Sequence, residues 1–156
     1  MPTSYDTRLE SSTDIAAPPE QVWSLVGDVL RMPEWSPQVD STRLRSGFER
    51  LELGAEFTNK NSQGELEWVT HGRVVRWAPG REVAFRIEEN WTVWSYTLQP
   101  YADGTRLTLR REAPDGLSDA SRSSIDDWFG GPDTFAATMR DGMDRTLAAI
   151  KAAVEG

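Results

Sequence analysis

Two hydrophobic periodicities divide the chain into extended and helical segments. In residues 6–15, Leu9 and Ile15 share one parity and charged residues occupy the other, which predicts a first strand. Between Val39 and Glu112, apolar residues recur at every second position, as in strands with one buried face. The clearest strand segments are Ala55–Asn61, Glu65–Trp77, Val83–Ile87, Trp94–Leu98 and Leu107–Arg111. Asp103-Gly104 favours a hairpin turn, so an antiparallel meander is expected.

A helix is predicted between the first strand and the meander. Ala17-Pro18-Pro19-Glu20 is typical of a helix start, because proline is tolerated where its missing N–H would have no partner. Apolar residues at helical spacing continue as far as Leu30, and Pro33 ends the helix. Residues 34–37 are expected to form a connector or a single extra turn.

The C-terminal segment predicts one long amphipathic helix. Beginning at Pro132, it would be roughly 35 Å long at ~1.5 Å per residue. Its apolar stripe consists of Phe135, Met139, Met143, Leu147, Ile150 and Val154. A shorter helix containing Ile125, Trp128 and Phe129 is expected ahead of it.

This order of elements predicts one α+β domain over residues 1–156, with helices on one face of an antiparallel sheet. A single amphipathic helix cannot cover the inner face of six or seven strands. Either the sheet curls around the helix and closes on side chains, or a cavity remains between them. Such a cavity is where we expect function to reside.

Composition then narrows the classes of function. The 156 residues include 17 Lys and Arg and 25 Asp and Glu, which gives a net charge of −8. This negative charge disfavours nucleic-acid binding. The chain has no Cys and one His, which excludes thiolate and multi-histidine metal sites, and we expect no metal or cofactor. No apolar stretch is long enough to span a membrane, and the N-terminus lacks the features of a secretory signal, so a cytoplasmic protein is expected.

Polar residues on the inner parity of the strands are the first candidates for a binding site. An unpaired buried polar group costs about 1–3 kcal/mol, so several on one face predict water, a ligand or mutual hydrogen bonds. The alternative is a bulge or a strand end that exposes some of them. These candidates are Asn59, Asn61, Thr70, Tyr96 and Arg111.

Large and adaptable apolar residues are the second group of candidates. The aromatic residues Phe57, Trp68, Phe85, Trp94 and Tyr96 would form a wall suited to flat apolar ligands, although they would also suit a plain core. On the last helix, Met139, Gly142 and Met143 share the inward face. A mid-helix glycine costs about 1 kcal/mol relative to alanine, so Gly142 needs a reason, such as room for a ligand or a close strand contact.

Other titratable groups give weaker signals. His71 has the opposite parity to Trp68 and Thr70, so we expect it to point outward unless a bulge near Gly72 reverses it. The pairs Glu88-Glu89 and Asp126-Asp127 are interpreted as solvated. The chain has no phosphate loop and no dinucleotide fingerprint.

The order of the motifs resembles the START-like (SRPBCC) superfamily, and within it the bacterial polyketide cyclase/dehydrase family. The matching segments are Ile15–Trp23, Met32–Pro37, Gly54–Phe57, Asn59–Asn61, Trp68, Pro79–Arg81, Ala84-Phe85, Trp94–Tyr96, Gly104–Leu107 and Leu147–Lys151. The resemblance implies a helix-grip fold: a curved antiparallel sheet of about seven strands wraps around a long C-terminal helix, with one or two short helices after the first strand. The family's aromatase/cyclases often carry Trp-x-Ser/Thr-x-Arg on a pocket strand, where this chain has Trp68-Val69-Thr70-His71-Gly72.

Three functions remain open from the sequence. The protein could bind and sequester or carry a hydrophobic small molecule, lipid- or polyketide-like, in an internal cavity. It could instead be an aromatase/cyclase or dehydratase, with Arg111 supplying the charge that Gly72 lacks and Tyr96 donating a proton. A third hypothesis is a groove for a partner's apolar segment. The sequence predicts neither the ligand nor the oligomeric state.

Overall fold

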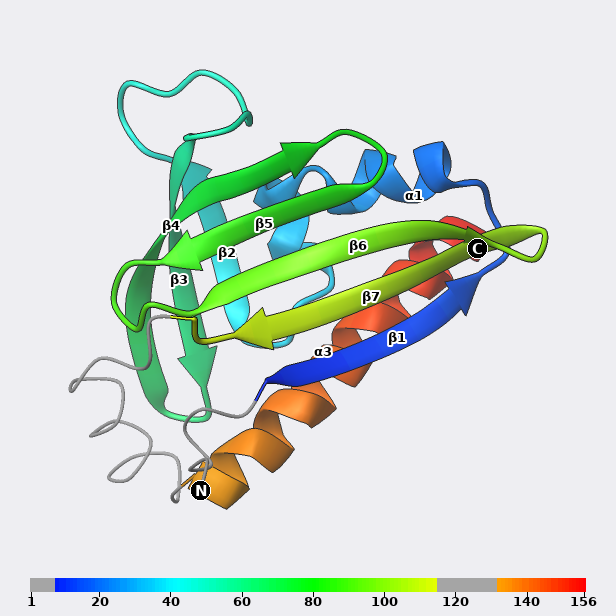
Figure 1. Ribbon diagram of the computed structural model, residues 1–156. Helices are drawn as coiled ribbons and strands as arrows, with labels where there is room; N and C mark the ends of the chain where they lie inside the picture. Colours follow the sequence, from blue (N-terminus) through cyan, green and yellow to red (C-terminus); the bar gives the residue numbers. More distant parts are fainter. Residues whose placement is uncertain (1–7, 115–131) are drawn as a thin grey trace.

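A computed structural model of the protein describes residues 8–114 and 132–156 (Figure 1). The predicted short helix with Ile125, Trp128 and Phe129, and the Asp126-Asp127 pair, lie outside these ranges. The elements, in chain order, are β1 (Leu9–Ile15), α1 (Pro19–Val26), η2 (Val29–Glu34), β2 (Val39–Leu44), β3 (Glu56–Gln63), β4 (Leu66–Ala78), β5 (Glu82–Ile87), β6 (Val93–Tyr101), β7 (Gly104–Glu112) and α3 (Pro132–Glu155).

The seven strands form one antiparallel sheet in the order β1-β7-β6-β5-β4-β3-β2. Strands β2 to β7 therefore form the predicted meander, and β1 pairs with the far edge, on β7. The register shifts between Val74 and Arg76 on β4, as in a β-bulge, which bends a strand. Figure 1 shows a strongly curved sheet with α3 crossing behind β7 and β1. The helix-grip architecture is confirmed.

The β6–β7 hairpin forms where the sequence predicted it, but for a different physical reason. Tyr101 pairs with Gly104, so Ala102 and Asp103 are the turn residues, and Ala102 carries the positive φ of 52°. Gly104 is required by crowding: a Cβ atom there would lie 2.1 Å from the carbonyl oxygen of Ile15. The glycine therefore allows β7 to approach the end of β1.

The core fills only part of the concave side of the sheet. α3 packs against β1 and β7, and α1 packs against β6. Within the predicted stripe of α3, the residues from Met143 through Leu147 to Ile150 are fully buried against these elements. The short helix η2 packs against β2. No helix in residues 8–114 or 132–156 has the length and apolarity needed to cross a membrane.

Candidate functional site

A cavity of about 570 Å³ lies between the sheet and α3, where the core ends. Its wall is formed by the inner faces of β3 to β7, by α3, and by η2 with the connector that follows it. The lining is mainly apolar and aromatic, and the volume lies in the range of small-molecule sites. The uncovered part of the sheet that the sequence predicted is therefore a hollow.

Strand register brings the predicted residues onto this wall in two rows. Phe85, Trp94 and Arg111 are direct cross-strand neighbours on β5, β6 and β7. Asn59 and Thr70 are neighbours on β3 and β4. Eleven of the twelve predicted residues border the cavity: Asn59, Asn61, Trp68, Thr70, Phe85, Trp94, Tyr96, Arg111, Met139, Gly142 and Met143. That they touch a ligand stays a prediction.

Phe57 is the exception, and its assignment to the cavity wall is wrong. It is fully buried, it does not border the cavity, and its ring packs edge-on against Phe85 at 5.4 Å between centroids. The ring occupies the space beside Gly72, where a Cβ atom would lie 2.3 Å from its Cζ. Because Phe57 fills this space, an arginine at position 72 could not fit without displacing the ring. Phe57 and Gly72 therefore belong to the core beside the cavity, where the Phe57 ring packs against Phe85.

The neutral polar residues of the cavity largely satisfy one another. The Thr42 hydroxyl donates to Asn59 Oδ1 at 2.7 Å. Asn61 Nδ2 donates to Thr70 Oγ1 at 3.1 Å and to the carbonyl oxygen of Trp68 at 3.3 Å. These bonds offset the desolvation that the asparagines undergo on burial.

Arg111 is the charged group deepest in the wall. Its residue is only 4% exposed, and burial lowers its pKa to about 10. The guanidinium carbon lies 5.9 Å from the ring centroid of Trp94 and 5.2 Å from that of Phe135. Arg111 therefore stays a cation at neutral pH, held between a sheet residue and a helix residue.

Tyr96 contributes a buried hydroxyl to the same wall. It is 4% exposed, and burial raises its pKa well above the ordinary value, opposed only by a hydrogen bond with Trp35. The indole N–H is a donor only, so Tyr96 accepts in that bond. At neutral pH its hydroxyl stays protonated, so it can donate a hydrogen bond but cannot serve as a base.

The residues of α3 that border the cavity provide flexible side chains and open space. Met139 and Met143 are buried and present flexible apolar side chains. Among the described residues, an added Cβ at Gly142 would meet only Pro37 Cγ, at 3.9 Å. Of the two explanations that the sequence predicts for this glycine, the geometry excludes the close strand contact and leaves room facing the cavity.

Sequence reasoning missed the contribution of the segment around η2. Met32, Pro37 and Val39 border the cavity, whereas the sequence predicts only a helix end, a connector and a strand start at these positions. Phe135 also borders it, and its place in the apolar stripe of α3 was the available signal. No signal in the sequence indicated that the η2 connector would reach the last helix.

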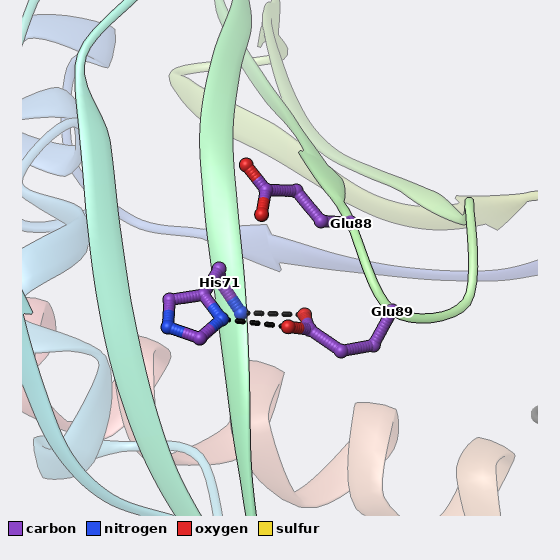
Figure 2. A group of neighbouring side chains, drawn as sticks. All are labelled: His71, Glu88 and Glu89. Atoms are coloured by element: carbon purple, nitrogen blue, oxygen red, sulfur yellow. Dashed lines mark hydrogen bonds and ion pairs between the residues drawn. The ribbon is translucent and has the colours of Figure 1, made fainter.

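His71 lies on β4 but is not among the residues that border the cavity. Its Nδ1 is 2.6 Å from Glu89 Oε2, and its backbone N–H donates to Glu89 Oε1 at 2.7 Å (Figure 2). Glu88 and Glu89 are both exposed, as the sequence predicts, and Glu89 in addition binds His71. With Glu88, these residues place three ligand atoms within 4.8 Å of one another, a juxtaposition that the sequence did not predict. Arg45 also approaches Glu88, at 3.7 Å.

Comparison with known structures identifies similar folds. The chain is 30% identical to a polyketide-cyclase-like protein, Cgl2372 of Corynebacterium glutamicum, covering 95% of this chain and 91% of that one with a TM-score of 0.62. Protein CV1439 of Chromobacterium violaceum is 19% identical over 96% and 97% of the two chains, with a TM-score of 0.67. The di-domain aromatase/cyclase StfQ of the steffimycin pathway is 13% identical, with a TM-score of 0.69, covering 95% of this chain and 49% of that one. The last two similarities concern the fold alone.

Comparison of sequences gives the family directly. No curated protein matches the chain. The profile of one family, described as polyketide cyclase/dehydrase and lipid transport, matches residues 6–155. This match spans every element that forms the cavity, and the helix-grip fold agrees with it. The chain belongs to the polyketide cyclase/dehydrase and lipid transport family.

Proposed function

We propose that the protein binds a hydrophobic small molecule, lipid- or polyketide-like, in the cavity between the sheet and α3, and sequesters or carries it. The observation that carries this proposal is the cavity of about 570 Å³ with its mainly apolar lining. Removal of apolar surface from water supplies affinity of about 25 cal/mol per Å² before the costs of association. Polar groups on the wall would orient the ligand's polar end.

The direct test is native mass spectrometry of the protein purified from its own host. A small apolar compound released on denaturation is expected. In the Gly142→Leu variant the new side chain would project into the cavity, so the compound should be lost while circular dichroism stays unchanged. Ala148→Leu, at an exposed position of the same helix, is the matched control and should retain the compound. A wild-type protein that carries nothing and takes up nothing from a lipid extract of the host would contradict the proposal.

The second candidate is a polyketide aromatase/cyclase or dehydratase acting in the same cavity. The observation that favours it is that Arg111 and Tyr96 both border the cavity. Arg111 would stabilise an enolate or oxyanion of the substrate, and the protonated hydroxyl of Tyr96 would donate a hydrogen bond to a carbonyl oxygen. Arginine is a poor proton carrier because it stays charged, which makes binding the leading proposal.

Turnover separates the two candidates. The binding proposal predicts that wild-type protein does not convert a poly-β-ketone substrate over many cycles, as followed by liquid chromatography and mass spectrometry. Multiple turnover would overturn it in favour of the enzyme. If turnover occurs but Tyr96→Phe and Arg111→Gln each leave it unchanged, these residues have no catalytic role.

A further inference from the structure

The charge of Arg111 lacks an acidic partner in the described part of the chain. A buried cation is costly unless a carboxylate or several acceptors compensate it. Within residues 8–114 and 132–156, Arg111 forms no ion pair, and its N–H groups donate no hydrogen bond to another described residue. No described side-chain nitrogen or oxygen is both sealed from solvent and without a partner. The guanidinium nitrogens are therefore accessible from the cavity that Arg111 borders.

In the part of the chain that the structure describes, the residues around the guanidinium contact it without using its N–H donors. The guanidinium carbon lies 5.9 Å from the ring centroid of Trp94 on β6 and 5.2 Å from that of Phe135 on α3. One ring therefore comes from the sheet and the other from the helix. Aromatic faces stabilise the cation electrostatically but accept no in-plane hydrogen bond. The planar fork of donors, which matches a carboxylate bidentately, is left for a molecule inside the cavity.

The other polar groups of the wall compete weakly for a ligand's polar end. Asn59 accepts from Thr42, Asn61 donates to Thr70, and Tyr96 accepts from Trp35. These groups therefore have only part of their hydrogen-bonding capacity left for a neutral hydroxyl or amide of a ligand. Within the described residues, Arg111 is the one basic residue on the wall and has its whole hydrogen-bonding capacity unused.

The charges around the cavity also set the charge of the ligand. Glu67 and Glu89 border the same cavity, and the chain as a whole carries a net charge of −8. The single positive charge of Arg111 can balance one negative charge on a ligand. A dianionic phosphate would keep one charge that Arg111 does not balance, in a cavity that Glu67 and Glu89 also border, which disfavours it.

We propose that the cavity selects amphipathic acids: molecules with an apolar, preferably aromatic, body and one carboxylate that Arg111 binds bidentately between Trp94 and Phe135. This inference rests on the proposed function, because it requires that the cavity binds an apolar molecule at all. It adds that the ligand's polar end is a monoanion, and that Arg111 distinguishes an acid from its neutral counterpart.

The test compares two probes of nearly the same shape, one anionic and one neutral. Anthracene-2-carboxylate and anthracene-2-carboxamide are titrated into the full chain by isothermal titration calorimetry at pH 7.5. Wild-type protein is expected to bind the carboxylate about 10- to 100-fold more tightly than the amide, as a charge-assisted bidentate contact implies. Arg111→Met, which keeps an unbranched apolar side chain of similar length, is expected to abolish this preference by weakening carboxylate binding while leaving amide binding unchanged.

Two further variants keep the result specific. Arg111→Lys retains the charge without the fork and should fall between wild type and Arg111→Met. Arg73→Met removes the same charge from an exposed position of β4 and should behave as wild type. Equal binding of the two probes by wild type, or an undiminished preference in Arg111→Met, would overturn the inference while leaving cavity binding intact. Failure of wild type to bind either probe would instead contradict the proposed function, and this inference with it.

Discussion

Replacing Arg111 by methionine should stabilise the folded protein in the absence of ligand. The substitution removes a charge that is 4% exposed and has no acidic partner in the described residues, and it keeps an unbranched side chain that can pack on Trp94 and Phe135. The expected direction is opposite to that of most core substitutions, which destabilise.

The magnitude follows from two opposing contributions. Burial lowers the pKa of Arg111 from its ordinary value of 12.5 to about 10, and each tenfold change in an acid dissociation constant corresponds to about 1.4 kcal/mol. Solvation lost by the charged form therefore destabilises the folded state by about 3 kcal/mol. The two aromatic contacts lie near the outer limit for such interactions and return about 1 kcal/mol. Arg111→Met should thus raise the free energy of unfolding by about 2 kcal/mol.

Urea denaturation at pH 7, followed by tryptophan fluorescence and circular dichroism, measures this difference. The control Arg73→Met should change the free energy of unfolding by less than about 0.5 kcal/mol. The advantage of Arg111→Met should stay constant up to about pH 10 and shrink above it. There the folded wild type loses its proton first, the unfolded state binds more protons, and wild-type stability rises relative to the variant. A loss of 1 kcal/mol or more in Arg111→Met at pH 7 would show that the charge is compensated in the folded protein and refute the reasoning.

Three further predictions concern the wall and its support. Gly142→Ala should raise the free energy of unfolding by about 0.5–1 kcal/mol in thermal or urea unfolding, because Pro37 Cγ at 3.9 Å is the one atom of residues 8–114 and 132–156 that the new methyl group meets; a decrease would contradict the open space assigned there. Gly72→Ala should lower the free energy of unfolding by about 1–3 kcal/mol, because the new methyl group collides with the Phe57 ring. In a double-mutant cycle, Phe57→Ala should remove most of this loss, and additive effects of the two substitutions on stability would exclude this contact as the cause. The free energy of unfolding of wild type relative to Tyr96→Phe should fall as the pH rises above about 10, because the Tyr96 hydroxyl ionises there only in the unfolded state; a pH-independent difference would show that burial does not raise its pKa.

Periodicity could predict most of the wall because side-chain direction in a strand is fixed by parity. Asn59, Trp94 and Arg111 each lie on the inner parity of their own strand, and the structure places all three on the cavity. Phe57 has the same parity as Asn59, yet it belongs to the core. Parity selects the face of the sheet, whereas position along the strand decides between core and cavity.

Contacts between distant segments could not be predicted in the same way. Glu89 holds His71 from the β5–β6 connection, and Pro37 approaches Gly142 from the connector after η2. Each contact joins residues that are far apart in the chain, and no local pattern of the sequence encodes their distance. The same holds for Gly104, whose requirement comes from the backbone of Ile15.

Local spacing and the order of motifs are enough to predict the α+β class, the strand and helix periods, and the family to which the chain belongs. The folded arrangement was needed to show that the curved sheet and α3 leave about 570 Å³ between them, and that Arg111 borders this space near two aromatic rings. Sheet curvature, strand register and helix placement together set the size of this space. A cavity is the volume that remains after all of them are fixed, and no single segment specifies it.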